Sequence, residues 1–268
     1  MNKVPVYSNP YDAVDRDALS RLKLHYFGVA DPVAARLVPT LSPFSAKLAA
    51  YLRFQKIPYE SVYEMGVDNA PRRKVPFISV DGVKIVDSDL IIGFLKTITP
   101  DPDAALSASQ RAIGHLVQRA LEDHLYWVVL YYEFYDDAGR EAFFKAGFGG
   151  FLPAFQPLVD DFADRMYEQG TGRYLPDEVI EKAKRDLAAV AEVLGDNRYL
   201  LGTDKPTSFD AAVFGMTVIM FQIRDMHPEI TDYFRSLPKL RAYIENLLRE
   251  FFPELESAAK ALEVESPT

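Results

Sequence analysis

The sequence predicts a two-domain protein in which an α/β domain is followed by an all-helical domain. The chain has 268 residues, which is long for a single compact core. Strand-like and helix-like stretches alternate only up to about residue 98, and every periodic stretch after that point has helical spacing. Apolar residues make up 49% of the chain, enough to fill two packed cores.

The domain boundaries follow from changes in local composition. We expect an N-terminal extension over 1–20, the α/β domain over 21–98, the helical domain over 107–252 and a tail over 253–268. The segment 97–106 carries two prolines and two aspartates among its ten residues and is typical of a linker.

The first half predicts the order β-α-β, then a β-hairpin, then a helix. Alternating apolar residues indicate strands in 21–27 and 58–63, and helical spacing indicates a helix in 41–57 that begins with Ser42 as N-cap and Pro43 in the first turn. Two β-branched runs, 75–80 and 83–86, flank Asp81-Gly82, a strong hairpin signal. Asp87, Ser88 and Asp89 then cap a further helix.

The second half predicts helices throughout. We place them over 107–137, 141–168, 177–194, 208–223 and 237–251. Thr207 and Asp210 stand in the T-x-x-D relation of a capping box at the start of the fourth of these helices.

Composition excludes several classes of function. A net charge of -9 and a pI near 5 argue against nucleic-acid binding. The absence of cysteine excludes disulfides, thiolate-metal sites and attack by a protein thiol. The four histidines show no metal-ligand spacing and no P-loop is present, so we predict neither a metal nor a nucleotide. The longest mainly apolar stretch, 211–223, is short for a membrane span, and no signal peptide is evident, so we expect a cytoplasmic protein.

Three features of the first half are candidates for one binding site. Val75-Pro76 precedes a strand, where a cis bond would present the Val75 backbone to an extended peptide, although an ordinary trans edge proline has the same sequence. Asp87-Ser88 begins a helix, where it would hold an amino-acid head group or simply cap the helix. The hydroxyl of Ser42 would stabilise a bound thiolate or serve only as an N-cap.

Together, LSPFSAKLAAYLRFQKIPYE, KVPFISVDG and IVDSDLIIGFL resemble the thioredoxin-like N-terminal domain of the glutathione S-transferase superfamily, in its branch of failed-axon-connections and metaxin-like proteins. In the second half, LEDHLYWVVLYYEF, QGTGRYLPDEV and RYLLGTDKPTSFDAAVFG resemble that branch's helical domain. The resemblance spans roughly 22–251. It implies the glutathione-transferase fold and a homodimer.

The resemblance also implies a role for each candidate. Ser42 would face the sulfur of glutathione, with Ser45 as the substitute. Val75 before a cis Pro76 would pair with the cysteinyl part. Ser88 would take the γ-glutamyl carboxylate and Asp87 the ammonium. Arg72, Arg73 or Lys74 would meet the glycyl carboxylate.

Two departures from the branch's pattern bear on the chemistry. Relatives often carry cysteine where this chain has Ser45, so no mixed disulfide with glutathione can form here. The long loop over 28–41 leaves the choice between Ser42 and Ser45 open. We therefore expect glutathione to be activated by a serine hydroxyl for attack on a small apolar electrophile. The rival is a non-catalytic binding or scaffolding protein, because fold alone does not fix function.

Aromatic residues supply candidates for an electrophile pocket. The helix after residue 121 is dense in aromatic side chains, and helical spacing places Trp127 and Tyr131 on a common face that forms either a pocket wall or core. Tyr26 on the first strand is an alternative hydroxyl donor that ranks below Ser42.

Overall fold

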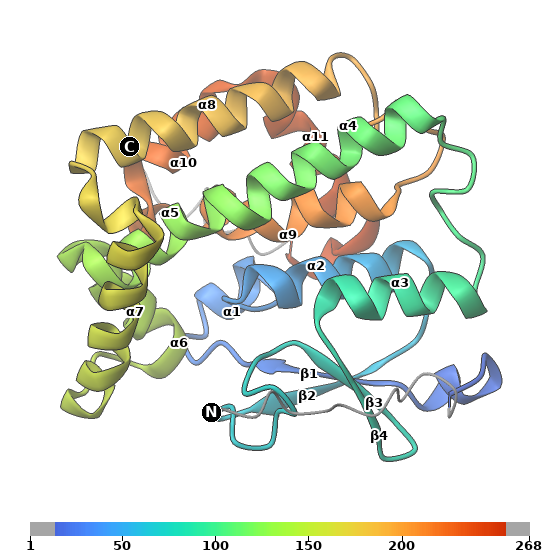
Figure 1. Cartoon of the computed structure of the whole chain (residues 1–268), viewed down its shortest axis with the longest axis horizontal. Helices are drawn as coiled ribbons and strands as arrows, with labels where there is room; N and C mark the ends of the chain where they lie inside the picture. Colours follow the sequence, from blue (N-terminus) through green and yellow to red (C-terminus); the bar gives the residue numbers. More distant parts are fainter. Residues whose placement is uncertain (1–13, 256–268) are drawn as a thin grey trace.

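A computed structural model describes residues 14–255 and confirms the predicted fold class, an α/β domain joined to an all-helical one (Figure 1). The first domain contains a four-stranded mixed sheet in the order β2-β1-β3-β4. The strands are β1 (Lys23–Phe27), β2 (Glu60–Glu64), β3 (Phe77–Val80) and β4 (Val83–Val86). β1 is parallel to β2 and antiparallel to β3, and β3 and β4 form the predicted hairpin. Both residues of its turn have positive φ, 50° at Asp81 and 85° at Gly82, as a tight hairpin turn requires.

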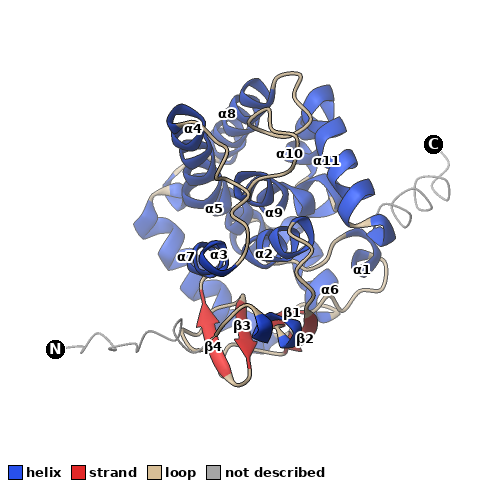
Figure 2. Cartoon of the chain, turned by 90° about the vertical axis from the view of Figure 1, so that its right-hand side faces the viewer, coloured by secondary structure: helices blue, strands red, loops and turns tan. Residues whose placement is uncertain are grey.

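Helices cover one face of the sheet and fill the rest of the described chain (Figure 2). The first domain contributes α1 (Ala34–Leu37), α2 (Pro43–Phe54) and α3 (Ser88–Ile98). The second contributes α4 (Ala108–Arg119), α5 (Tyr126–Leu130), α6 (Asp137–Phe148), α7 (Gln156–Gln169), α8 (Pro176–Leu194), α9 (Ser208–Gln222), α10 (Pro228–Ser236) and α11 (Pro238–Phe251). The four helices α4, α8, α9 and α11 begin close to where the sequence predicts them.

The predicted helix over 141–168 is wrong, because two helices occupy that region. α6 ends at Phe148, and the next two residues, Gly149 and Gly150, have φ values of 77° and 144°, which favour glycine. Pro153 then precedes α7. The prediction also missed α10, a short helix that begins at Pro228 and buries Ile230 and Phe234.

The predicted helix over 107–137 contains two π-helical turns that periodicity does not reveal. η3 (Ala120–Leu125) follows α4, and η4 (Tyr131–Tyr135) follows α5. α6 then starts at Asp137 after a change of direction at Asp136. Each π turn carries one buried glutamate, Glu122 and Glu133. π turns inside α-helices are frequent at functional sites.

The two domains meet where α2 packs on α9. All 15 residues of α9 are buried, which explains why this helix is apolar all round. The close approach requires Gly215, since a Cβ there would lie 2.4 Å from the backbone nitrogen of Lys47. The start of α9 is fixed by Asp210, whose carboxylate accepts hydrogen bonds from the backbone N–H groups of Leu200 and Thr207, from the Thr207 hydroxyl and from the Tyr243 hydroxyl.

Candidate functional site

Three backbone segments converge at one end of the sheet. His25 near the end of β1 lies opposite Phe77 at the start of β3, and Phe77 lies opposite Val86 at the end of β4. The loop before α2 returns to the same end, because the Thr40 hydroxyl donates to the carbonyl of Phe27 at 3.0 Å. The register therefore brings together the start of α2, the residues before β3 and the start of α3, which carry the candidate residues of the first domain.

Ser42 is the N-cap of α2, as predicted. Its Oγ accepts the backbone N–H of Ser45 at 3.4 Å, and its own backbone N–H donates to Thr40. A serine N-cap uses the oxygen lone pairs and leaves the hydroxyl proton for another acceptor. The half-buried Ser42 hydroxyl is thus able to donate to a bound thiolate.

Ser45 lies one turn deeper in the same helix. Its side chain is fully buried, and its Oγ has no hydrogen-bond partner among the residues that the structure describes. Of the two serines, Ser42 is the one that solvent reaches.

Val75 and the buried Pro76 are joined by a cis peptide bond. Val75 is half-buried, and its backbone N–H and carbonyl make no hydrogen bond within residues 14–255. A main-chain segment of this kind is able to pair with an extended peptide.

Asp87 and Ser88 begin α3. Asp87 has a φ of 71°, and its Oδ1 accepts the backbone N–H groups of Asp89 and Leu90. The side chain of Asp87 is nevertheless exposed, while Ser88 is buried with 4% of its surface accessible. The pair offers a helix N-terminus beside a carboxylate, which suits the two charges of an amino-acid head group.

The three basic residues before Val75 are all exposed. Arg73 has a φ of 52° and pairs with Asp68 at 3.2 Å. Lys74, next to Val75, has no ion pair with another described residue.

Aromatic side chains of the helical domain lie against the start of α2. The ring of Phe44, two residues after Ser42, packs edge-on against Tyr126 with centroids 4.9 Å apart, and Tyr126 contacts Trp127. All three rings are half-buried, so part of each surface remains open. Tyr131 lies one turn further along and is buried against Tyr132 and Tyr135. The contact between Phe44 and Tyr126 was not predicted, although Phe44 lies between the two candidate serines, Ser42 and Ser45.

Tyr26 does not join this group. Its hydroxyl donates to Ser61 on β2 at 2.9 Å, and its ring packs on Tyr63. Burial raises the pKa of Tyr26 above its ordinary value. Neither the hydrogen bond nor the ring contact of Tyr26 involves Ser42 or an aromatic side chain of the helical domain.

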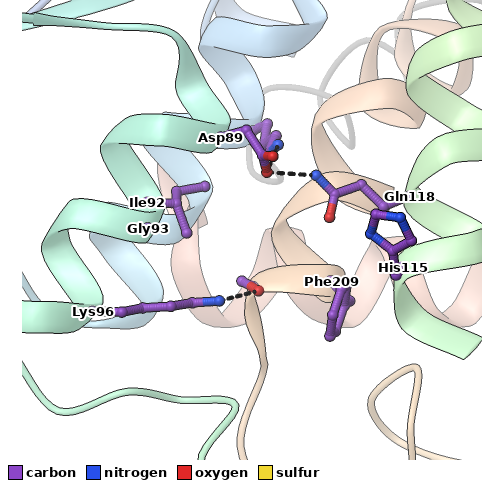
Figure 3. Close-up of a pocket in the computed structure, with 9 residues that line it drawn as sticks. Asp89, Ile92, Gly93, Lys96, His115, Gln118 and Phe209 are labelled. Atoms are coloured by element: carbon purple, nitrogen blue, oxygen red, sulfur yellow. Dashed lines mark hydrogen bonds and ion pairs between the residues drawn. The ribbon is translucent and has the colours of Figure 1, made fainter. Parts of the chain in front are cut away.

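A separate polar cavity of about 230 Å³ lies between α3, α4 and the start of α9 (Figure 3). Its lining includes Lys47, Lys96 and Ser208 together with Asp89 and Gln118. These groups are largely paired with one another or with neighbours: Lys96 donates to Ser208, and Gln118 to Asp89. Burial acts to raise the pKa of Asp89, but the positive charge of Lys47 outweighs this effect and the pKa is lowered. We interpret the cavity as part of the contact between the domains.

Comparison with known proteins identifies the family. A glutathione S-transferase N-terminal domain model matches residues 43–139, and a glutathione S-transferase C-terminal domain model matches residues 183–247. The isoprene-epoxide–glutathione S-transferase of Rhodococcus sp. strain AD45 is 30% identical over 228 residues, covering 80% of this chain and 94% of the relative. The chain belongs to the glutathione S-transferase family.

Other members of the family place it in the predicted branch. Failed axon connections of Drosophila melanogaster is 26% identical, in an alignment that covers 85% of this chain and 58% of the relative. Metaxin-2 of Homo sapiens is 24% identical, in an alignment that covers 80% of this chain and 84% of the relative. Among solved glutathione S-transferase folds, the β-etherase LigF of Sphingobium sp. strain SYK-6 aligns with a TM-score of 0.58 at 17% identity, covering 90% of this chain and 99% of that one.

No group of three or more His, Asp or Glu side chains within residues 14–255 is arranged to hold a metal ion. In the same range, no helix has the length and apolar character needed to span a bilayer.

Proposed function

We propose that this protein is a glutathione transferase in which the Ser42 hydroxyl stabilises the thiolate of bound glutathione. The observation that carries the proposal is the meeting of three groups at one end of the sheet: the Ser42 hydroxyl, the unpaired backbone of Val75 and the start of α3 with the exposed Asp87 and the buried Ser88. They match the thiol, the peptide main chain and the γ-glutamyl head group of glutathione. Bound glutathione would supply the nucleophilic sulfur.

Each part of glutathione would be bound by a different residue of the site. The hydroxyl and the backbone N–H of Ser88 suit the γ-glutamyl carboxylate, since the N–H groups of Asp89 and Leu90 already donate to Asp87. The carboxylate of Asp87 suits the ammonium. Val75 would pair with the cysteinyl main chain, and the exposed Lys74 beside it suits the glycyl carboxylate. Ser45 is buried beneath this surface, so Ser42 is the better candidate for the sulfur.

The acceptor would bind over Phe44, Tyr126 and Trp127, which adjoin Ser42 and expose apolar surface. Such a wall suits a small apolar electrophile. The relative from Rhodococcus bears the name isoprene-epoxide–glutathione S-transferase, and it aligns over 94% of its length. We therefore propose small apolar epoxides as the first acceptors to test.

Calorimetry with glutathione tests the binding half of the proposal. Wild type, Ser42→Ala and Ser88→Ala are compared with Ser109→Ala, which removes the hydroxyl of an exposed serine of α4. That hydroxyl makes no hydrogen bond with a described residue. We expect Ser88→Ala to weaken binding about 10-fold, the value of one hydrogen bond to a charged group. Ser109→Ala should bind as wild type does.

Ultraviolet absorbance of the bound thiolate tests the chemical half. We expect Ser42→Ala to raise the pKa of bound glutathione by about one unit, because the thiolate loses a hydrogen bond that favours its charged form. If wild type fails to bind millimolar glutathione, the proposal is wrong, and the retained fold favours the scaffolding alternative.

Homodimer formation and cytoplasmic location remain predictions from the resemblance and the sequence. The dimer is checked by sedimentation equilibrium.

A further inference from the structure

A buried threonine just before α2 uses its hydroxyl for two hydrogen bonds. Thr40 is 0% exposed. Its Oγ1 donates to the carbonyl of Phe27 at 3.0 Å and accepts the backbone N–H of Ser42 at 3.1 Å. A hydroxyl has one proton to donate and lone pairs that accept, so the two bonds are compatible. This single hydroxyl therefore connects the last residue of β1 to the N-cap residue of α2.

The two hydrogen bonds close a long loop at its base. Residues 28–41 separate β1 from the N-cap of α2, and the only helix among them is the four-residue α1. Loops are more mobile than the elements that they connect, so a loop of this length does not by itself fix the residue that follows it. Phe27, in contrast, belongs to the sheet, where it lies opposite Glu64 of β2. Thr40 thus ties Ser42 directly to the sheet.

The earlier part of the loop is held by the helical domain. The backbone N–H of Asp31 donates to the carbonyl of Ala146 in α6 at 2.9 Å, and Nε2 of Gln222 in α9 donates to the carbonyl of Leu37 at 3.1 Å. Both contacts involve residues at least five positions before Ser42, so they anchor the loop without bonding to the N-cap residue. The contact that acts on Ser42 directly is the one from Thr40.

The direction of the Ser42 hydroxyl depends on the position of the Ser42 backbone. One rotatable bond separates the backbone from the oxygen, and this oxygen already accepts the backbone N–H of Ser45 at 3.4 Å. A shift of the Ser42 backbone therefore moves the hydroxyl with it. A displacement of about 1 Å in a positioned group can cost a large factor in rate.

We propose that Thr40 is a positioning residue, whose hydroxyl holds Ser42 where the Ser42 hydroxyl donates to the glutathione sulfur. This inference rests on the proposed function and adds a residue that does not touch glutathione itself. Because Thr40 is fully buried, it acts on the sulfur only through Ser42.

Three single variants and a matched control test the role. Thr40→Val keeps the shape of the side chain and removes both hydrogen bonds, Thr40→Ser keeps the hydroxyl, and Ser42→Ala removes the group on which Thr40 acts. The control is Thr231→Val in α10. Thr231 is also fully buried, and its hydroxyl likewise donates to a backbone carbonyl, that of Met220 in the helical domain.

Calorimetry and thiolate absorbance measure the affinity for glutathione and the pKa of its bound thiol. For Thr40→Val we expect this pKa to rise by up to about one unit, toward the value in Ser42→Ala, because the hydrogen bond to the thiolate is weakened. The Kd for glutathione should stay within about twofold of wild type, since the other contacts remain. Thr40→Ser should recover most of the wild-type pKa, and Thr231→Val should change neither quantity.

The double variant Thr40→Val/Ser42→Ala decides whether Thr40 acts through Ser42. Once the Ser42 hydroxyl is absent, the loss of the Thr40 hydrogen bonds should raise the pKa of bound glutathione no further. The double variant should therefore equal Ser42→Ala, whereas independent effects would add. An additional rise would overturn the inference, because it would mean that Thr40 acts by another route.

Amide hydrogen exchange in wild type gives a test that does not depend on the folding of a variant. We expect the Ser42 N–H, measured by NMR, to exchange slowly because Thr40 accepts it in a buried setting. Thr40→Ser should preserve this protection. Fast exchange in wild type would show that Thr40 does not hold Ser42 and would overturn the inference.

The failure of this inference and the failure of the proposed function give different results. If Ser42→Ala raises the pKa of bound glutathione and Thr40→Val raises it by less than about 0.3 unit, Thr40 has no positioning role and the proposed function stands. Equal effects of Thr40→Val and Thr231→Val would mean that a buried hydroxyl supports folding only, with the same consequence. Absence of glutathione binding by wild type would refute both proposals.

Discussion

Glu122 and Glu133 occupy equivalent settings on one helical segment but differ completely in their partners. Each lies in a π turn, and they are 6% and 4% exposed. Glu122 accepts from Lys47 Nζ at 2.6 Å and from Gln118 at 3.0 Å, and it also pairs with Arg119. Glu133 has none of these contacts. The comparison shows that burial alone does not define the role of a carboxylate: Glu122 links the two domains, whereas Glu133 is buried with no hydrogen bond or ion pair to a described residue.

Removing the partner of Glu122 should have the largest effect on stability. Lys47 is 1% exposed, so Lys47→Met leaves a buried carboxylate without its main counter-charge. We expect the free energy of unfolding to fall by about 3–5 kcal/mol in urea denaturation. The double variant Lys47→Met/Glu122→Leu should recover most of the loss, because it removes both charges. A loss below about 1 kcal/mol for the single variant would contradict the contrast between the two glutamates.

His227 extends the comparison to a buried base. It is fully buried, neither ring nitrogen has a partner in the described chain, and burial lowers its pKa to about 3 from 6.5. Below pH 6.5 His227 is protonated in the unfolded chain, whereas in the folded chain it stays neutral down to about pH 3. The free energy of unfolding should therefore decline as the pH falls through this range.

Urea denaturation at pH 7 and pH 4.5 measures this decline. Between the two values wild type should lose about 2 kcal/mol more than His227→Leu, which has no ring to titrate. Equal losses in the two proteins would show that water or a rearrangement solvates the ring.

Glu133 should give the smallest effect on stability, with the opposite sign. Its folded pKa is raised, so its stabilising contribution is complete below the unfolded value of about 4.5 and is lost as the pH rises through the folded pKa. Glu133→Gln should therefore be close to wild type in stability at pH 4.5, within about 1 kcal/mol, and more stable than wild type at pH 9. Melting temperatures at the two pH values measure the gap. A gap that does not widen with pH would indicate that folding does not raise the pKa of Glu133.

Local signals predicted the first domain well. The helix starts and the hairpin turn of this domain are determined by residues next to them in the sequence: Ser42-Pro43, Asp81-Gly82 and Asp87. Such short-range signals can be recognised in the sequence alone. The helix predicted over 141–168 failed although Gly149 and Gly150 were visible, because apolar spacing on both sides of the break looks continuous.

The sequence alone could not predict which residues pair with the buried charges. Lys47 and Glu122 are 75 positions apart, and nothing near either residue identifies the other. Glu133 reads as one polar residue in a run of aromatic ones, and only the packing of the π turn shows that it is buried and unpaired. Phe44 and Tyr126 meet for a similar reason, since they belong to different domains.

The packing of α9 also limits how this protein can be divided. Its 15 residues are buried on every side, and Gly215 rests on the backbone of α2 from the other domain. A chain cut between α3 and α4 would give one fragment with an uncovered α2 and another with an uncovered α9, both apolar. The two domains are therefore poor candidates for separate expression or for exchange with the domains of relatives, and a chimaera must carry α2 and α9 together.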